Sequence, residues 1–215
     1  ALLAAHTSYY CWRQILLTEF MTGLRRCELL ALHWSDIDLS EGWLQVRYSL
    51  IGGERKPGMT KNPVILCDPK TATSKRKLFI PPALCKELTA YKTRQAAMRL
   101  KADSWEHPDL VFTYGNGEYI TPAVFSGVFY HIRKKLGINT TFHMLRHDMA
   151  SRMKASHQFD FKDIQAQLGH STIQITMDIY THIDDQQKAA VSTWLENDVG
   201  NIIETTTPTK KRQLR

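Results

Sequence analysis

Apolar side chains recur at helical spacing along most of this 215-residue chain. Near its start, Trp12, Leu16 and Phe20 stand at i, i+4 and i+8, which predicts a helix over residues 8–21 with these three side chains facing the core. Further helices are expected over residues 25–34, 82–102, 122–137, 141–156, 161–168 and 184–197, and one more runs from a Ser-Thr cap at residues 171–172 through Tyr180.

Three short segments are predicted to be strands, and the first alternates between apolar and polar residues, as a strand with one buried face does. In the first of them, Leu44, Val46 and Tyr48 fall on one side of the strand. The segments are residues 43–48, 64–66 and 77–80, with a turn predicted at Gly52-Gly53. We therefore expect a mostly α fold with one small antiparallel β-sheet of about three strands, an α+β class.

Composition and charge are those of a globular protein with a basic surface. Hydrophobic residues make up 43% of the chain, and the net charge is +7, which is compatible with a polyanionic partner. Cys11, Cys27, Cys67 and Cys85 form no C-x-x-C pair, so we expect buried free thiols in a reducing compartment. No apolar run of ~18 residues suggests a membrane span.

The segment His143-Met144-Leu145-Arg146-His147 is the strongest chemical signal. On a helix, His143, Arg146 and His147 share one face because they stand at i, i+3 and i+4. Two imidazoles and a guanidinium repel one another when all are charged, so an anion bound over them would explain the arrangement. Taken alone, the segment is also compatible with an ordinary solvated polar face.

Two other segments place reactive side chains near the ends of helices. A Leu-Gly-His segment ends at His170, and Tyr180 follows ten residues later. A Thr-Gly turn places Arg25 at the start of a helix, where free backbone N–H groups and the helix dipole also favour an anion. Each residue alone is compatible with a structural role as a cap, an anchored tyrosine or a surface arginine.

Taken together, these residues resemble the catalytic set of the tyrosine recombinase family, the integrases of phages and conjugative transposons. The motifs are T-G-x-R-x-x-E at residues 22–28, H-x-L-R-H at 143–147, L-G-H at 168–170 and T-x-x-x-Y-x-H at 176–182. The resemblance covers nearly the whole chain and implies the catalytic-domain fold of that family. The set consists of Arg25, Lys70, His143, Arg146, His170 and Tyr180.

The resemblance implies a role for each member of the set. Arg25 and Arg146 look like the arginine pair that grips the scissile phosphate, and Tyr180 looks like the nucleophile. His143 is similar to the family's acid/base histidine, and His170 to its second histidine-or-tryptophan position.

Further positions follow from the same resemblance. Lys70 matches the family's lysine in the turn between two strands, with Lys75 and Lys77 as alternatives. Glu28 resembles the acidic residue that supports the first arginine. Asp148 departs from the family pattern, which often has threonine there, so we expect its carboxylate to point away from the site or to pair with a nearby cation. Residues 54–62 look like an insertion in the sheet.

The activity implied by the resemblance is DNA strand cleavage and rejoining through a 3′-phosphotyrosyl intermediate, with site-specific recombination or integration as its outcome. Two arginines and two histidines would supply positive charge to the reacting phosphate, so no metal and no other cofactor are expected. A type IB topoisomerase is one alternative. A non-catalytic DNA-binding regulator with a helix-turn-helix at residues 161–180 is the other.

The expected partners are double-stranded DNA and further copies of the chain, assembled as a tetramer on DNA. Residues 1–197 are expected to form the catalytic domain and residues 198–215 a tail that neighbouring protomers exchange. A cytoplasmic protein encoded by a bacterium or a phage is expected. The basic residues predicted to contact DNA phosphates are Arg133, Lys134, Lys135 and Lys154.

Overall fold

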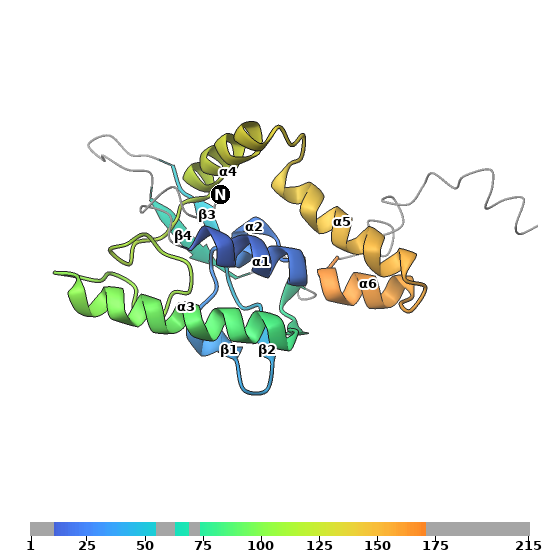
Figure 1. Cartoon of the computed structure of the whole chain (residues 1–215), viewed down its shortest axis with the longest axis horizontal. Helices are drawn as coiled ribbons and strands as arrows, with labels where there is room; N and C mark the ends of the chain where they lie inside the picture. Colours follow the sequence, from blue (N-terminus) through green and yellow to red (C-terminus); the bar gives the residue numbers. More distant parts are fainter. Residues whose placement is uncertain (1–10, 55–62, 69–73, 171–215) are drawn as a thin grey trace, which may run out of the picture. The chain divides into compact units, whose positions relative to one another are not determined.

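The computed structural model describes residues 11–54, 63–68 and 74–170 (Figure 1). Its helices are α1 (Trp12–Thr22), α2 (Arg26–Leu29), α3 (Pro82–Lys101), α4 (Pro122–Leu136), α5 (Phe142–Ala155) and α6 (Phe161–Leu168), with the 3-10 helix η2 (Trp34–Asp36) after α2. Its strands are β1 (Ile37–Asp38), β2 (Trp43–Gln45), β3 (Ser49–Gly52), β4 (Val64–Cys67) and β5 (Lys77–Phe79). The mostly helical α+β class is confirmed. The helices expected beyond residue 170 and the predicted boundary at residue 197 lie outside the described residues.

The buried face of α1 differs from the predicted one. Trp12 is buried as expected, but Phe20 is 45% exposed and carries the Arg152 guanidinium over its ring. The buried positions of α1 include the polar residues Thr18 and Glu19. The prediction was wrong because it equated the apolar face with the buried one, whereas α1 packs against both α3 and α5 (Figure 1).

The second helix is shorter than predicted because the chain leaves it to pair with a distant segment. Leu32 O accepts the Val111 N–H at 2.8 Å, and His33 forms a β-bridge with Leu110. These contacts need extended backbone, so α2 ends at Leu29 instead of continuing to residue 34. The apolar run at residues 110–112 is thereby fully buried.

The strands form two small antiparallel sheets instead of the single sheet that we expected. One has the order β1-β2-β5, and the other pairs β3 with β4. Leu44 in β2 lies opposite Leu78 in β5, and Leu50 in β3 lies opposite Leu66 in β4. The strand predicted over residues 43–48 ends at Gln45, and β3 begins only at Ser49, because the two strands pair with different partners, which the alternating pattern does not show.

The later helices begin and end close to the predicted residues. Thr121 caps α4 by accepting the Val124 N–H, and Gly137 ends the helix with a φ of 67°. Asp160 caps α6 by accepting the N–H groups of Lys162 and Asp163. Such caps satisfy backbone groups at helix ends that have no partner inside the helix, and their sequence signals are local.

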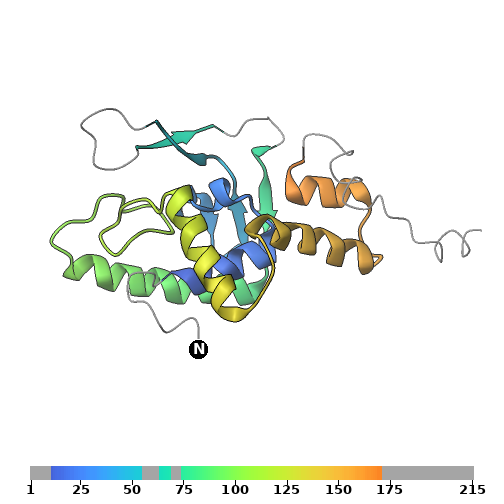
Figure 2. The same cartoon turned by 90° about the horizontal axis from the view of Figure 1, so that it is seen from above.

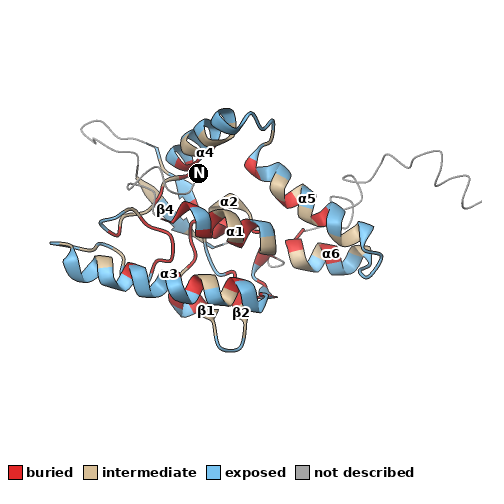
Figure 3. Cartoon of the chain, in the orientation of Figure 1, coloured by how far each residue is buried: buried red, intermediate tan, exposed pale blue. Residues whose placement is uncertain are grey.

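The core joins α1, α3 and the start of α5 to the small sheets, and Figure 3 shows the buried residues in red, with α3 exposing much of its outer surface. An aromatic cluster links the helices: Phe125 of α4 stacks on Trp12 and meets Phe142 of α5 edge-on, with both ring-centroid separations at 4.8 Å. Both views place α6 beside α5 (Figure 2). Among the described residues, no helix is long and apolar enough to cross a membrane.

The four cysteines are free thiols, as predicted, but only Cys11 is buried. Burial raises the pKa of the Cys11 thiol to about 12, so it stays protonated. Cys27, Cys67 and Cys85 are half-buried, which contradicts the expectation that all four lie in the core.

Candidate active site

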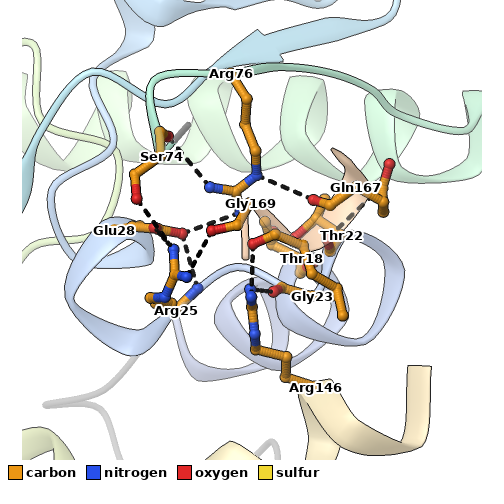
Figure 4. A network of polar contacts seen from close by, with 11 residues as sticks. Thr18, Thr22, Gly23, Arg25, Glu28, Ser74, Arg76, Arg146, Gln167 and Gly169 are labelled. Carbon is orange, nitrogen blue, oxygen red and sulfur yellow. Dashed lines mark hydrogen bonds and ion pairs between the residues drawn. The ribbon is translucent and has the colours of Figure 1, made fainter. Parts of the chain in front are cut away.

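Three arginines converge on the carboxyl end of α6 (Figure 4). Arg76 Nε donates to the Gln167 carbonyl at 3.0 Å, Arg146 Nη2 to the Leu168 carbonyl at 2.5 Å, and Arg25 Nη2 to the Gly169 carbonyl at 2.7 Å. Three successive carbonyls therefore each accept one guanidinium. The last carbonyls of a helix lack partners within it and carry the negative end of its dipole, so cations suit this place.

Arg25 is held by its own helix as well as by α6. It is the N-cap of α2, and Glu28 accepts both the Arg25 backbone N–H at 3.0 Å and Nη1 at 2.7 Å. The free N–H group that we expected to favour an external anion is thus already used by the Glu28 carboxylate. The Arg25 side chain remains 37% exposed, so part of its guanidinium is open to a ligand.

Arg146 is the most enclosed of the three arginines, with only 2% of its surface exposed. Its Nη1 donates to the Gly23 carbonyl at 2.5 Å. Burial, followed by repulsion from Arg25 and Arg76, lowers the pKa of Arg146 to about 9. Its burial contradicts the alternative that the H-x-L-R-H segment is an ordinary solvated polar face.

The turn at Gly23 depends on the absence of a side chain. Gly23 has a φ of 64°, and a Cβ there would lie 2.8 Å from both Leu168 Cδ2 and Met149 Sδ. Glycine adopts this left-handed conformation without the steric cost that other residues incur. The Thr-Gly turn of the sequence motif therefore lets α5 and α6 approach closely enough for Arg146 to reach the Gly23 carbonyl.

Arg76 was missed in the sequence, although a signal was present. Residues 74–80 alternate between buried and exposed, which places Arg76 on the same side as Leu78 and Ile80. An arginine in phase with the buried face of a strand requires a buried partner. Here the partners include Glu28, whose Oε2 accepts Arg76 Nη2 at 3.1 Å.

Two histidines of α5 lie against each other, and their rings meet edge-on with centroids 4.5 Å apart. Burial and then the neighbouring His147 and Arg146 lower the pKa of His143, while burial and Arg146 lower that of His147. His170, 6% exposed, follows α6, and burial together with Arg146 and Arg25 lowers its pKa to about 4. All three imidazoles are consequently neutral near pH 7.

A buried carboxyl group lies within the electrostatic reach of the arginines. Glu19 on α1 is fully buried, and neither of its side-chain oxygens has a hydrogen-bond partner among the described residues. Burial raises the pKa of Glu19 to about 8, partly offset by attraction to Arg146. Sequence periodicity gave no sign of this group.

The remaining predicted residues lie apart from this cluster or outside the described residues. Lys70 and Tyr180 are outside them. Lys75 forms an ion pair with Asp68 at 3.0 Å, and Lys77 lies 4.0 Å from the centroid of the Trp43 ring. Both lysines alternate with Arg76 along the strand and so point to the opposite face.

The basic residues predicted to contact DNA occupy two helices. Arg133, Lys134 and Lys135 form the last turn of α4, and Lys154 is near the end of α5.

Asp148 pairs with a nearby cation, as expected for a carboxylate in a cationic region: Arg152 Nε donates to its Oδ2 at 2.8 Å. Among the described residues, no group of three or more histidine, cysteine or acidic side chains is placed to hold a metal ion.

The cluster is suited to bind a phosphate and to exchange protons with a bound group. Arg25 and Arg146 offer positively charged donors, and neutral imidazoles accept protons. The sequence motifs brought together as predicted are those of Arg25, Glu28, His143, Arg146 and His170.

Known proteins are similar to this chain in sequence and in fold. The chain is 34% identical over 183 residues to a tyrosine recombinase XerC-like protein of Caldanaerobacter subterraneus subsp. tengcongensis, covering 82% of this chain and 46% of that protein. It thus spans about half the length of the curated relatives it matches.

Two solved structures have the same fold. An integrase of the Tn1549 transposon, solved in complex with transposon right end DNA, superimposes with a TM-score of 0.70 at 22% identity, covering 90% of this chain and 61% of that one. A crystal structure of XerA recombinase gives a TM-score of 0.58 at 26% identity, with the same coverage of 90% and 61%. The phage integrase family matches residues 2–187, most of the sequence. The chain belongs to the phage integrase family.

Proposed function

We propose that this chain is the catalytic domain of a tyrosine recombinase, which carries out site-specific DNA recombination or integration through a 3′-phosphotyrosyl intermediate. The observation that carries the proposal is the convergence of Arg25 and Arg146 on adjacent carbonyls of α6, with His170 next in the chain. The relatives are named recombinases and integrases, which favours this activity over topoisomerase or regulator functions.

The two arginines would bind the non-bridging oxygens of the scissile phosphate. Negative charge grows on these oxygens during attack, and a guanidinium offers a planar fork that matches them. Because both side chains are anchored to backbone carbonyls, their free N–H groups are preorganised before DNA binds. Preorganised charge of this kind stabilises a transition state without reorganising during the reaction.

Tyr180 would be the nucleophile, with His143 as its base. The phenol has a reference pKa of about 10 and needs a proton acceptor near neutral pH. The lowered pKa of His143 keeps its imidazole neutral and able to accept that proton. The Tyr180 oxygen then bonds to phosphorus, and the bond from phosphorus to the 5′ oxygen of the leaving strand breaks.

Lys70 would protonate that 5′ oxygen. Its rivals Lys75 and Lys77 contact Asp68 and Trp43 and point away from Arg76, which supports Lys70 as the proton donor. The phosphotyrosyl bond conserves the energy of the phosphodiester. A 5′ hydroxyl from a second strand can reverse the step onto a new partner, so no cofactor is needed.

Assembly would complete the reaction, with four copies on paired DNA sites and the C-terminal segment exchanged between neighbours. The apolar pair Ile202-Ile203 of that segment, residues 198–215, would pack against the neighbouring protomer. A groove of about 440 Å³ with a mainly apolar lining runs between α1 and α4 and offers a surface of matching chemistry. Deletion of residues 198–215 should then reduce recombination between two sites more than cleavage at one.

Covalent trapping tests the proposal directly. A nicked suicide DNA substrate should leave the chain covalently attached to DNA, and peptide mapping should find the link at Tyr180. Tyr180→Phe should abolish attachment while retaining DNA binding. A regulator would form no covalent complex, and relaxation of supercoiled DNA without exchange between sites would indicate a topoisomerase instead.

A further inference from the structure

Arg76 is a buried arginine with three partners in three different segments. It precedes β5, is 8% exposed, and each of its three side-chain nitrogens donates to an acceptor within the protein. Besides the Gln167 carbonyl and Glu28, it donates through Nη1 to the Ser74 carbonyl at 3.3 Å. One planar side chain thus links the strand, α2 and the carboxyl end of α6 (Figure 4).

Arg76 and Arg25 share both of their main supports. The Glu28 carboxylate accepts Arg76 at Oε2 and the Arg25 side chain at Oε1, so each arginine limits how the carboxylate can turn. The two guanidinium groups also bind α6 carbonyls two residues apart, at Gln167 and Gly169. A rotation of Glu28 or a shift of α6 would therefore move Arg25 unless Arg76 opposed it.

The fit between Arg76 and α6 is close. Gly169 has a φ of 66°, and a Cβ at this position would lie 2.8 Å from Arg76 Nη1 and 3.0 Å from its Cδ and Cζ. The guanidinium thus packs directly against the Gly169 backbone. Ser74 adds a second connection, because its hydroxyl accepts Arg25 Nη1 at 3.4 Å while its carbonyl accepts Arg76.

We propose that Arg76 is a positioning residue for strand cleavage, which orients Arg25 through Glu28 and the carboxyl end of α6 without itself touching DNA. This inference rests on the proposed recombinase function. Its consequence is a separation of steps: Arg76 matters for the rate of phosphotyrosyl formation and much less for DNA affinity, which depends on exposed cations.

The ionisation of Glu28 gives a signature of this role. Burial raises the pKa of Glu28, but Arg76 and Arg25 outweigh it and hold that pKa below its ordinary value. The other charged groups coupled to Glu28 are Glu19 on α1 and Arg146 on α5. Without Arg76 the Glu28 pKa rises, so the carboxylate protonates at higher pH and releases Arg25 there.

Substitutions at Arg76 test the proposal in the 215-residue chain. Arg76→Ala should slow covalent complex formation on a nicked substrate by ~10²-fold, the scale for losing one oriented charge. Duplex affinity, measured by fluorescence anisotropy in a Tyr180→Phe background, should change less than ~3-fold, since one phosphate contact or fewer is involved. Arg76→Lys should not restore the rate, because an ammonium group cannot span three acceptors in a plane.

The control is Arg94→Ala, which removes one exposed positive charge from α3 and should leave the cleavage rate unchanged. The acid limb of the pH–rate profile should move to higher pH in Arg76→Ala. It should return to the wild-type position in Arg76→Ala/Glu28→Gln, which has no carboxyl group to titrate at this position. Equal losses of binding and cleavage, a wild-type rate in Arg76→Lys, or an unshifted acid limb would each overturn the proposal.

A measurement that needs no turnover keeps the two proposals separate. Absence of any covalent complex with the wild-type chain would count against the recombinase function alone. Carbon-13 NMR titration of the Glu28 carboxyl in wild type and Arg76→Ala should still show a higher pKa in the variant, which lacks the positive charge beside the carboxylate, and the Arg25 side-chain resonances should shift. Unchanged Glu28 and Arg25 signals in a folded variant would refute the positioning role.

Discussion

At the scale of single residues, the site combines positively charged arginines with groups held neutral by burial. Arg146 is almost fully buried, yet its two Nη groups are satisfied by carbonyls of Gly23 and Leu168. His170 beside it has a pKa of about 4, and Glu19 a pKa of about 8. Neutral histidines and a neutral carboxyl group leave the arginines as the dominant charges near pH 7.

Removal of the buried guanidinium should therefore be costly. Arg146→Ala should lower the rate of covalent complex formation by about 10²–10³-fold, the range expected when one preorganised charge-stabilising donor is removed. Single-turnover assays on the nicked substrate measure this rate. Arg152→Ala is the matched control, since Arg152 lies on the same helix and pairs at the surface with Asp148. A wild-type rate for Arg146→Ala would remove Arg146 from the mechanism.

Glu19 should make stability depend on pH. Its pKa is about 8 in the folded chain and near its ordinary value of 4.5 when unfolded, so the folded state binds the proton more tightly. The stabilisation present below pH 4.5 is lost as pH rises towards 8. Glu19→Gln removes this loss, and its advantage in unfolding free energy should grow to on the order of 2–4 kcal/mol by pH 8. Urea unfolding at several pH values measures the difference, and a pH-independent difference would contradict the assignment.

At the scale of elements, local signals predicted helix ends well and sheet pairing poorly. The predicted ends of α4, α5 and α6 lie within one residue of the observed ones, because caps such as Thr121 and Gly137 depend on only a few consecutive residues. The pairing of β3 with β4 and the early end of α2 depend on partners far along the chain, which a periodic pattern does not encode. In the site, recognisable motifs located Arg25 and Arg146, whereas Arg76 and Glu19 belong to no motif.

Two glycines provide a matched comparison for the end of α6. Gly169 and Gly137 each follow a helix with nearly the same φ, 66° and 67°, but a Cβ at Gly137 meets nothing within 4 Å. Gly137→Ala should cost about 1 kcal/mol from backbone strain alone. Gly169→Ala should cost more in thermal unfolding and also slow cleavage, because its methyl group displaces Arg76. Equal costs for the two substitutions would show that the contact with Arg76 is unimportant.

At the scale of the whole chain, the net charge of +7 predicts a salt-dependent affinity for DNA. Lys134→Ala/Lys135→Ala should lower the slope of log affinity against log salt by up to about 2, one unit for each phosphate that is no longer neutralised. Anisotropy titrations of the Tyr180→Phe chain at several salt concentrations measure the slope. Lys86→Ala, on the exposed surface of α3, serves as a control. An unchanged slope in the double variant would place the DNA elsewhere.

Three arginines bind backbone oxygens at the end of α6, and this affects which substitutions α6 can accept. A main-chain carbonyl is present whatever side chain its residue carries, so replacements at Gln167 or Leu168 leave both acceptors in place. Substitutions at the half-buried Gln167 therefore leave the acceptor of Arg76 in place, whereas Leu168 is restricted by its own packing because it is fully buried beside Gly23. The anchoring of the arginines therefore requires that α6 keep its helical backbone and its terminal glycine. It depends on the path of that backbone more than on which side chains can form hydrogen bonds there.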